Sequence, residues 1–273
     1  MSKTKPDFKR MLLRLPHNRQ DYATVRIIAE LAGLLSTDLV GTYVEDLSVC
    51  DLAEFPNARE FRAGSWQPFS AQQLARDTAL AVQEAERLFF ENAGRFGSKP
   101  SFRVAREPLA VSHEPEVDDI VVVIEPRNPI ERATHQFNEF LRAAFRSTSS
   151  ILLMPGRTRN PSGPVIVIAS SPDDPGIATG IDIAASTRER MILVPTRMPN
   201  ELRLQIQERA QIAGVGLSVR EAAFRDGEIL LPASVKGRLL ILNRRQVSGR
   251  PRALQMPTLL VSEAFSIRPP DLR

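Results

Sequence analysis

Residues 165–194 read VIVIASSPDDPGIATGIDIAASTRERMILV, and this stretch decides the fold class. Its first five residues form an uninterrupted apolar run, which is typical of a strand buried on both faces of a parallel sheet. The serines, prolines and aspartates of 170–175 predict a turn and the start of a helix that reaches about Thr187. A second apolar run follows at 191–194. Strand, helix and strand in this order predict a βαβ unit.

The same alternation continues outward from this unit in both directions. Before it, the patterns predict strands at 11–15, 39–44, 102–106, 120–124 and 151–154 and helices at 21–35, 70–92 and 128–145. After it, they predict a helix at 200–213 and strands at 217–224, 239–242 and 258–261. Leu15 corresponds to Ala169 at an offset of 154, and Leu39 to about Ile192 at an offset of 153. This near-constant offset indicates a tandem duplication.

The predicted fold class is therefore α/β, with two tandem doubly wound parallel-sheet domains, of which the second is smaller and degenerate. The predicted parts are a first domain at 1–156, a turn-rich linker at 157–163 and a second domain at 164–273. The second domain lacks an equivalent of the irregular excursion at 45–69 and has no clear helix between its last two strands. Both last strands are apolar, and an exposed apolar edge strand favours aggregation. We expect them to lie near each other in an intramolecular pseudo-dimer.

Composition narrows the classes of protein that fit. The chain has 273 residues, 42% of them hydrophobic and 25% charged, which is average for a globular protein. No apolar run approaches the ~18–20 residues of a membrane helix, and no hydrophobic stretch of a secretory signal follows the charged start MSKTKPDFKR. The one cysteine, Cys50, cannot form an internal disulfide, so we expect a cytoplasmic protein that contacts no membrane. A net charge of +4 does not indicate a general nucleic-acid surface.

The sequence contains few candidates for catalytic or metal-binding residues. The histidines and the cysteine are scattered without the spacing of metal ligands: His17, His113, His135 and Cys50. The sequence contains no G-x-S-x-G, P-loop or G-x-G-x-x-G motif. No metal site, cofactor or catalytic residue is therefore predicted. Asp173 and Asp174 have two interpretations, a metal or adenine contact and a helix start whose dipole favours carboxylates, and we favour the helix start. Gly176 and Gly180, one turn apart, predict close packing of the helix on the sheet.

The excursion at 45–69 carries Phe55, Phe61, Trp66 and Phe69, more aromatic surface than a freely solvated loop. We expect it to lie over the cleft of the first domain or at an interface. For Trp66, the only tryptophan, a hydrophobic anchor is favoured over a plug of the cleft or a partner contact.

The order of these elements, together with LAGLL at 31–35 and DLVGTYVEDL at 38–47, resembles the universal stress protein family. The resemblance implies an adenine-nucleotide α-hydrolase-like fold, with five parallel strands per domain in the order 3-2-1-4-5 and association through the last strand. In such a sheet, ligands bind at the carboxyl ends of strands one and four.

The resemblance also predicts where ATP would bind, because ATP-binding members carry G-x2-G-x9-G-[ST] after strand four. Ile124 and Arg127 stand at the first two glycine positions, and Phe137-Asn138 stand at the Gly-[ST] position. The acidic residue expected after strand one is replaced by Pro16-His17-Asn18. Glycines let the backbone approach phosphates, so their loss places ATP binding in doubt. In the second domain, Asn243 and Pro257 are only 14 positions apart, too few for the loop and helix.

An atypical pocket for a ligand or anion is still conceivable at the same edge. The candidate contacts are Pro16, His17, Asn18, Arg127, Asn128, Asn138, Ser170, Ser171, Arg244 and Arg245. The segment 243–252 adds Arg250 and Arg252 and contains no acid, so it carries +4. Arginine forks suit phosphate or carboxylate, but such a segment is also typical of a solvated basic loop.

The function that fits these observations is a non-catalytic stress-response or regulatory protein that binds a protein or ligand, with a protein partner or self-association expected. One alternative is a nucleotide or anion sensor with an atypical pocket. The other is an enzyme of the wider nucleotide α-hydrolase-like superfamily, for which the sequence offers no nucleophile or acid–base pair.

Overall fold

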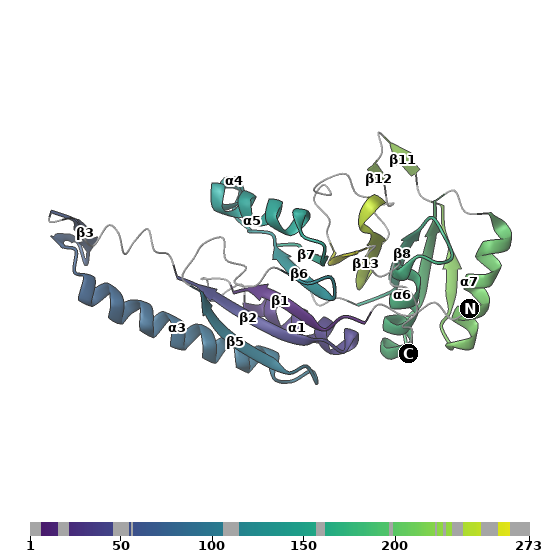
Figure 1. Cartoon of the computed structure of the whole chain (residues 1–273), viewed down its shortest axis with the longest axis horizontal. Helices are drawn as coiled ribbons and strands as arrows, with labels where there is room; N and C mark the ends of the chain where they lie inside the picture. The colour runs from purple at the N-terminus through teal and green to yellow at the C-terminus, as the bar shows by residue number, and fades with distance from the viewer. Residues whose placement is uncertain are drawn as a thin grey trace.

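The computed structural model describes residues 7–15, 22–45, 55, 57–105, 115–156, 162–196, 199–221, 223–225, 228–230, 237–246 and 256–262. The first half contributes the strands β1 (Arg10–Arg14), β2 (Asp38–Val44), β5 (Pro100–Ala105), β6 (Asp119–Ile124) and β7 (Ser150–Met154). The second half contributes β8 (Val165–Ala169), β9 (Met191–Pro195), β10 (Leu217–Val219), β13 (Leu239–Asn243) and β14 (Thr258–Val261). These strands form one ten-stranded sheet in the order β10-β9-β8-β13-β14-β7-β6-β1-β2-β5 (Figure 1).

Each half is a parallel sheet in the order 3-2-1-4-5, so the predicted doubly wound class is confirmed. The registers also show how the halves correspond. Met11 pairs with Leu39 on one side and Ile120 on the other, and Val165 pairs in the same way with Met191 and Leu239. Met11 is therefore the counterpart of Val165, which gives the predicted offset of 154. Leu39 corresponds to Met191, one residue before the predicted position.

The two halves are joined by antiparallel pairing of their last strands, β7 and β14. Leu153 lies opposite Thr258, Leu152 opposite Leu259, and Ile151 opposite Leu260. The predicted proximity of these two strands is confirmed. The parallel registers of β6–β7 and β13–β14 make Leu152 and Leu259 equivalent residues. Because these two also face each other, the pseudo-two-fold axis passes between them.

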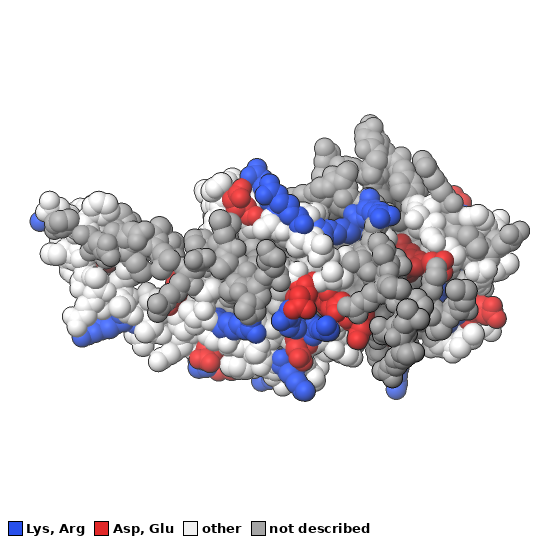
Figure 2. All heavy atoms as spheres, in the orientation of Figure 1, with Lys and Arg blue, Asp and Glu red and all other residues white. Residues whose placement is uncertain are grey.

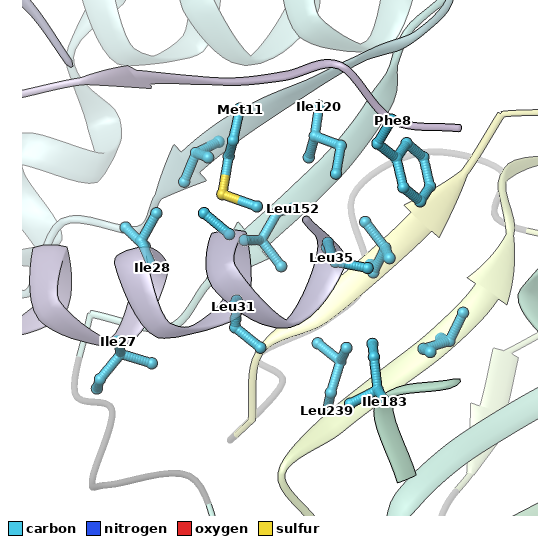
Figure 3. Close-up of a cluster of buried hydrophobic side chains, with 14 of the residues drawn as sticks. Phe8, Met11, Ile27, Ile28, Leu31, Leu35, Ile120, Leu152, Ile183 and Leu239 are labelled. Atoms are coloured by element: carbon cyan, nitrogen blue, oxygen red, sulfur yellow. The ribbon is translucent and has the colours of Figure 1, made fainter. Parts of the chain in front are cut away.

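Helices cover both faces of the sheet. One face is packed by α1 (Tyr22–Leu35), α3 (Ala71–Ala93), α6 (Pro175–Thr187) and α7 (Asn200–Ile212), whose buried side chains belong to one hydrophobic cluster that spans both halves. Figure 3 shows Leu31 of α1 and Ile183 of α6 in this cluster beside Leu152 and Leu239 of the sheet. The other face carries α5 (His135–Arg146), preceded by the short α4 (Pro129–Ala133). Within the described residues, no helix is long and apolar enough to cross a membrane.

Most predicted helices are present, but one is divided. The apolar stripe of α1 is buried throughout; it consists of Val25, Ile28, Leu31, Ala32 and Leu35. Ser70 caps α3 by accepting a hydrogen bond from Gln73 N at 3.3 Å. The helix predicted at 128–145 is wrong as a single element, because Thr134 has an extended backbone between α4 and α5. Its hydroxyl accepts a hydrogen bond from Phe137 N at 3.3 Å, so this threonine ends one helix and starts the next.

The predicted burial and secondary structure are also wrong at three places, because contacts between distant parts of the chain decide the structure there. No residue of α3 before Ala85 is buried: Leu74, in the apolar stripe of the helix, is half-buried, and Ala81 is exposed. The strand predicted at 217–224 stops at Val219, and β11 (Ala223–Arg225) pairs instead with β12 (Glu228–Leu230). The described part of the excursion forms a hairpin of β3 (Arg59–Arg62) and β4 (Ser65–Pro68) at the far end of α3, away from the sheet (Figure 1).

The hairpin leaves its aromatic residues in solvent. Phe55 and Phe61 are 64% exposed and Trp66 is 65% exposed, whereas Phe69 is half-buried. The prediction that the excursion covers the cleft of the first domain is therefore wrong for its described part. Trp66 is not a buried anchor either. Residues 46–54, with Cys50, lie outside the described residues.

Close contact between α6 and the sheet depends on two glycines, as predicted. A Cβ atom on Gly176 would lie 3.1 Å from Ile241 Cγ2. A Cβ atom on Gly180 would overlap Val167 Cγ2 and approach Met191 Sδ to 3.2 Å.

We expect Gly180→Ala to lower the free energy of unfolding by about 1–3 kcal/mol, because overlap with the buried strand outweighs the better helix propensity of alanine. Urea denaturation measures this change. Gly216→Ala is the control, because its Cβ would meet only Arg190 Cγ at 3.7 Å. Equal stability of the two variants would contradict the packing argument.

Candidate functional site

The carboxyl ends of β1 and β6 form the switch point of the first half, where sheet topology favours a ligand. Pro16, His17 and Asn18 lie outside the described residues, so their role stays a prediction. After β6, Arg127 Nε donates a hydrogen bond to the carbonyl of Gly156 at 2.7 Å. Glu125 N donates to Met154 O at 2.8 Å. A Cβ atom on Gly156 would lie 2.5 Å from Glu125 O, so the loops after β6 and β7 are closely fitted to each other.

The side chains of Asn128 and Asn138, which lie nearby, form hydrogen bonds at the two ends of α4. Asn128 Oδ1 accepts a hydrogen bond from Ile130 N at 2.9 Å and so starts α4. Asn138 Nδ2 donates to Arg132 O at 3.3 Å, near the end of α4, and to Thr134 O at 2.9 Å, which also accepts from Asn138 N at 3.2 Å.

The positions of the family's glycines are filled by apolar side chains that pack into the protein. Phe137 is half-buried against the hydrophobic cluster on the α5 face. Ile124 is half-buried against the cluster on the opposite face. Neither side chain opens a backbone cradle of the kind that glycines provide for phosphates.

The equivalent corner of the second half follows β8. Ser170 is exposed, and Ser171 Oγ accepts a hydrogen bond from Asp173 N at 3.3 Å. Asp174 is buried and caps α6, with its Oδ1 accepting from Gly176 N at 2.9 Å. The interpretation of this segment as a helix start is confirmed. Burial raises the pKa of Asp174 to about 6, and the bond from Gly176 opposes the shift only in part.

Arg244, just after β13, is directed into the first half. Its Nη1 donates to Ser147 O at 2.6 Å and Ser149 O at 2.7 Å, and its Nη2 donates to Ala144 O at 3.3 Å and to Phe145 O. These carbonyls lie at the carboxyl end of α5, where the helix dipole and the unpaired carbonyls favour a cation. Burial lowers the pKa of Arg244 from its ordinary value, because the charged guanidinium loses solvation between the two halves.

The other arginines of the basic segment are placed differently. Arg245 is exposed, and its backbone N donates to Asn243 Oδ1 at 3.0 Å. Arg250 and Arg252 lie outside the described residues. The ten candidate contacts are therefore not seen gathered into one pocket.

A second arginine across the junction was missed by the sequence argument. Arg238 Nη1 donates to Glu30 Oε1 of α1 at 2.5 Å, and its Nε donates to Glu189 Oε2 at 2.7 Å. The hydrogen bond that Arg238 donates to Glu189 is the main cause that raises the pKa of Arg238. Glu30 and Arg238 are separated by 208 positions, so no local pattern could have indicated the pair.

The described residues offer few ligands for a metal ion. His135 is exposed on α5. Across the described residues, no three His, Cys, Asp or Glu side chains are grouped as ligands of a metal ion.

The fold of this chain, but not its sequence, is similar to that of known proteins. No protein-family model matches the sequence, and no curated protein matches it significantly. Among solved structures, the chain is similar to a universal stress protein from Archaeoglobus fulgidus DSM 4304, with a TM-score of 0.57, 8% identity, and coverage of 93% of this chain and 96% of that one. The chain has a universal stress protein-like fold. A functionally unknown protein from Pseudomonas aeruginosa PAO1 is also similar, with a TM-score of 0.50, 13% identity and coverage of 94% of both chains. Identities this low show the universal stress protein-like fold and nothing about ligands.

We expect Asp174→Asn to stabilise the protein at neutral pH, because asparagine caps the helix equally well without a buried charge. The folded-state pKa of about 6 lies above the unfolded value of 3.8, so the wild type loses stability as pH rises through this window. The variant should gain on the order of 3 kcal/mol over the wild type between pH 4 and pH 7.5. Urea denaturation across this range is the measurement. A difference between the two proteins that does not change with pH would contradict the assignment.

We expect Arg244→Met to lower the free energy of unfolding by about 3 kcal/mol, because it leaves carbonyls at the end of α5 without their donor. Arg245→Met is the matched control, since Arg245 is exposed, and it should change the free energy by less than about 0.5 kcal/mol. Thermal and urea unfolding of both variants measure this. Similar losses in the two would argue against the cap.

Proposed function

We propose that this protein is a non-catalytic, cytoplasmic stress-response or regulatory protein that acts by binding a protein or a ligand, and that it does not hold ATP in the glycine-loop manner. The observation that carries the proposal is the use of the phosphate positions for internal contacts. Arg127 bonds to Gly156 O, Asn138 caps α4, and Phe137 packs into a core. The stress role is taken from the printed name of the similar Archaeoglobus fulgidus protein.

The stereochemistry of phosphate binding supports the part of this proposal that concerns ATP. Phosphate oxygens need backbone amides within about 3 Å, and side chains the size of isoleucine and phenylalanine prevent that approach. Side-chain donors alone would remain, and a triphosphate needs several amides in one concave loop.

A second candidate is a sensor of a small anion. Arg127 and Arg245 are both exposed after the fourth strands of the two halves, so guanidinium groups are present at the edge where the topology favours ligands.

Calorimetry with Mg-ATP, run beside a hydrolysis assay, tests both candidates. We expect no heat of binding at millimolar nucleotide and no hydrolysis. Micromolar binding that disappears in Arg127→Ala, but persists in the exposed control Arg142→Ala, would overturn the ATP part and favour the sensor. Hydrolysis above the uncatalysed rate would overturn the non-catalytic assignment.

A further inference from the structure

One part of the molecule stands apart from the sheet. We call it the arm and define it as the hairpin of β3 and β4 together with residues 71–84 of α3 (Figure 1). At 1.5 Å per residue, this part of α3 is about 20 Å long. Local bonds support it, including the cap at Ser70 and a hydrogen bond from Gln73 Nε2 to Asp77 Oδ1 at 2.9 Å.

The sequence of α3 has an apolar stripe on one side of the helix. Apolar residues recur at helical spacing from Leu74 and Ala81 to Ala85 and Phe89. Full burial begins only at Ala85, while Val82 is half-buried against the core, Leu74 is half-buried and Ala81 is exposed. Leu80, on another side of the helix, is 63% exposed. Among the described residues, the packing of α3 on the protein's core therefore ends at about Val82, and the helix continues beyond it along the arm.

The tip of the arm carries an exposed pair of aromatic side chains, a residue type that is enriched at the centres of protein interfaces. Phe61 and Trp66 face each other across the hairpin, with ring centroids 5.5 Å apart in an edge-to-face arrangement. The turn has positive φ at Ala63 (50°) and Gly64 (84°), the backbone of a tight two-residue hairpin. Figure 2 shows that the described surface of the arm is largely uncharged on this face. An isolated two-stranded hairpin is marginally stable in water, and large aromatic side chains dominate interface cores.

We propose that the arm docks against the arm of a second copy of this chain, antiparallel about a two-fold axis, so that each hairpin lies on the other copy's α3. A two-fold arrangement lets one surface serve as both partners.

The exposed area suits a dimer of this kind. Aromatic side chains present about 150–250 Å² each, so Phe61 and Trp66 at roughly two-thirds exposure offer about 260 Å² per copy. Two copies together offer about 520 Å² of aromatic surface. Stable interfaces bury at least ~1,200 Å² in total, of which ~56–58% is apolar, so the two tips supply about three-quarters of the apolar part of a small stable interface.

The charges of the arm and of α3 are complementary. Residues 57–69 contain two arginines and one glutamate, a net charge of +1. The whole of α3 contains two arginines against four acids, a net charge of −2. An antiparallel pair places the basic hairpin of one copy over the acidic helix of the other, whereas a parallel pair would place like charges together.

The single tryptophan makes the test direct, because all tryptophan emission of the full chain comes from Trp66. Sedimentation equilibrium over a concentration series should show a dimer. Trp66 emission should shift to the red on dilution, with the same midpoint as dissociation. Phe61→Ser should weaken the dimer at least tenfold and leave the thermal midpoint of unfolding of the monomer unchanged, because Phe61 is exposed.

Ile130→Ser is the matched control, since Ile130 is 76% exposed on α4, away from the arm, and this change should leave the dimer intact. Leu80→Ser is a second arm variant and should weaken the dimer as Phe61→Ser does. A chain that is monomeric at hundreds of micromolar would overturn the proposal, whatever other protein the arm binds. So would a dimer that both arm variants leave unchanged, or one that Ile130→Ser dissociates. None of these outcomes depends on whether ATP binds.

Discussion

The antiparallel pairing of β7 with β14 is the contact on which the rest of the structure depends. Each of these strands is the last of its half and is almost wholly buried, with only Leu153 partly exposed. In a separate domain either strand would be an apolar sheet edge with unpaired amides, which is a template for aggregation. Pairing removes both edges at once and turns two five-stranded sheets into one. It also brings α1 and α6 together, so that a single core extends across the junction.

The polar contacts across the junction follow from this pairing. Once β14 lies beside β7, the residues after β13 face the end of α5, and Arg244 can reach four carbonyls there. Ser262 Oγ donates to Thr148 O at 2.6 Å at the same end of the sheet. Arg238 joins Glu30 to Glu189 across the junction. An arginine buried among acceptors is costly to remove but specific in where it can sit, so these contacts also define the register of the two halves.

The predictable part of the fold is the part encoded by local patterns. The limits of β8 and β14, the buried stripe of α1 and the caps at Ser70, Asn128 and Asp174 all rest on residues within a few positions of one another. The role of Arg244 could not be predicted, because its acceptors lie 95–100 positions away. Arginine forks suit phosphates and helix ends alike, and only the tertiary arrangement distinguishes the two. The division at Thr134 was missed for a similar reason, since a mid-helix threonine is compatible with either outcome.

The same pairing also restricts how the molecule can associate further. The resemblance to universal stress proteins implies association through the last strand, and here that edge is occupied by the other half of the same chain. Contact with another copy must therefore use different surfaces. The outer strand β10 pairs over only three residues, and β5 begins with a proline and carries an exposed Arg103, features that weaken an edge as a template. The arm has the opposite character, with the aromatic pair of Phe61 and Trp66 exposed at its tip and Leu80 exposed on its helix. Large apolar side chains gathered at the end of a projecting element suit contact with a partner better than these two strand edges do.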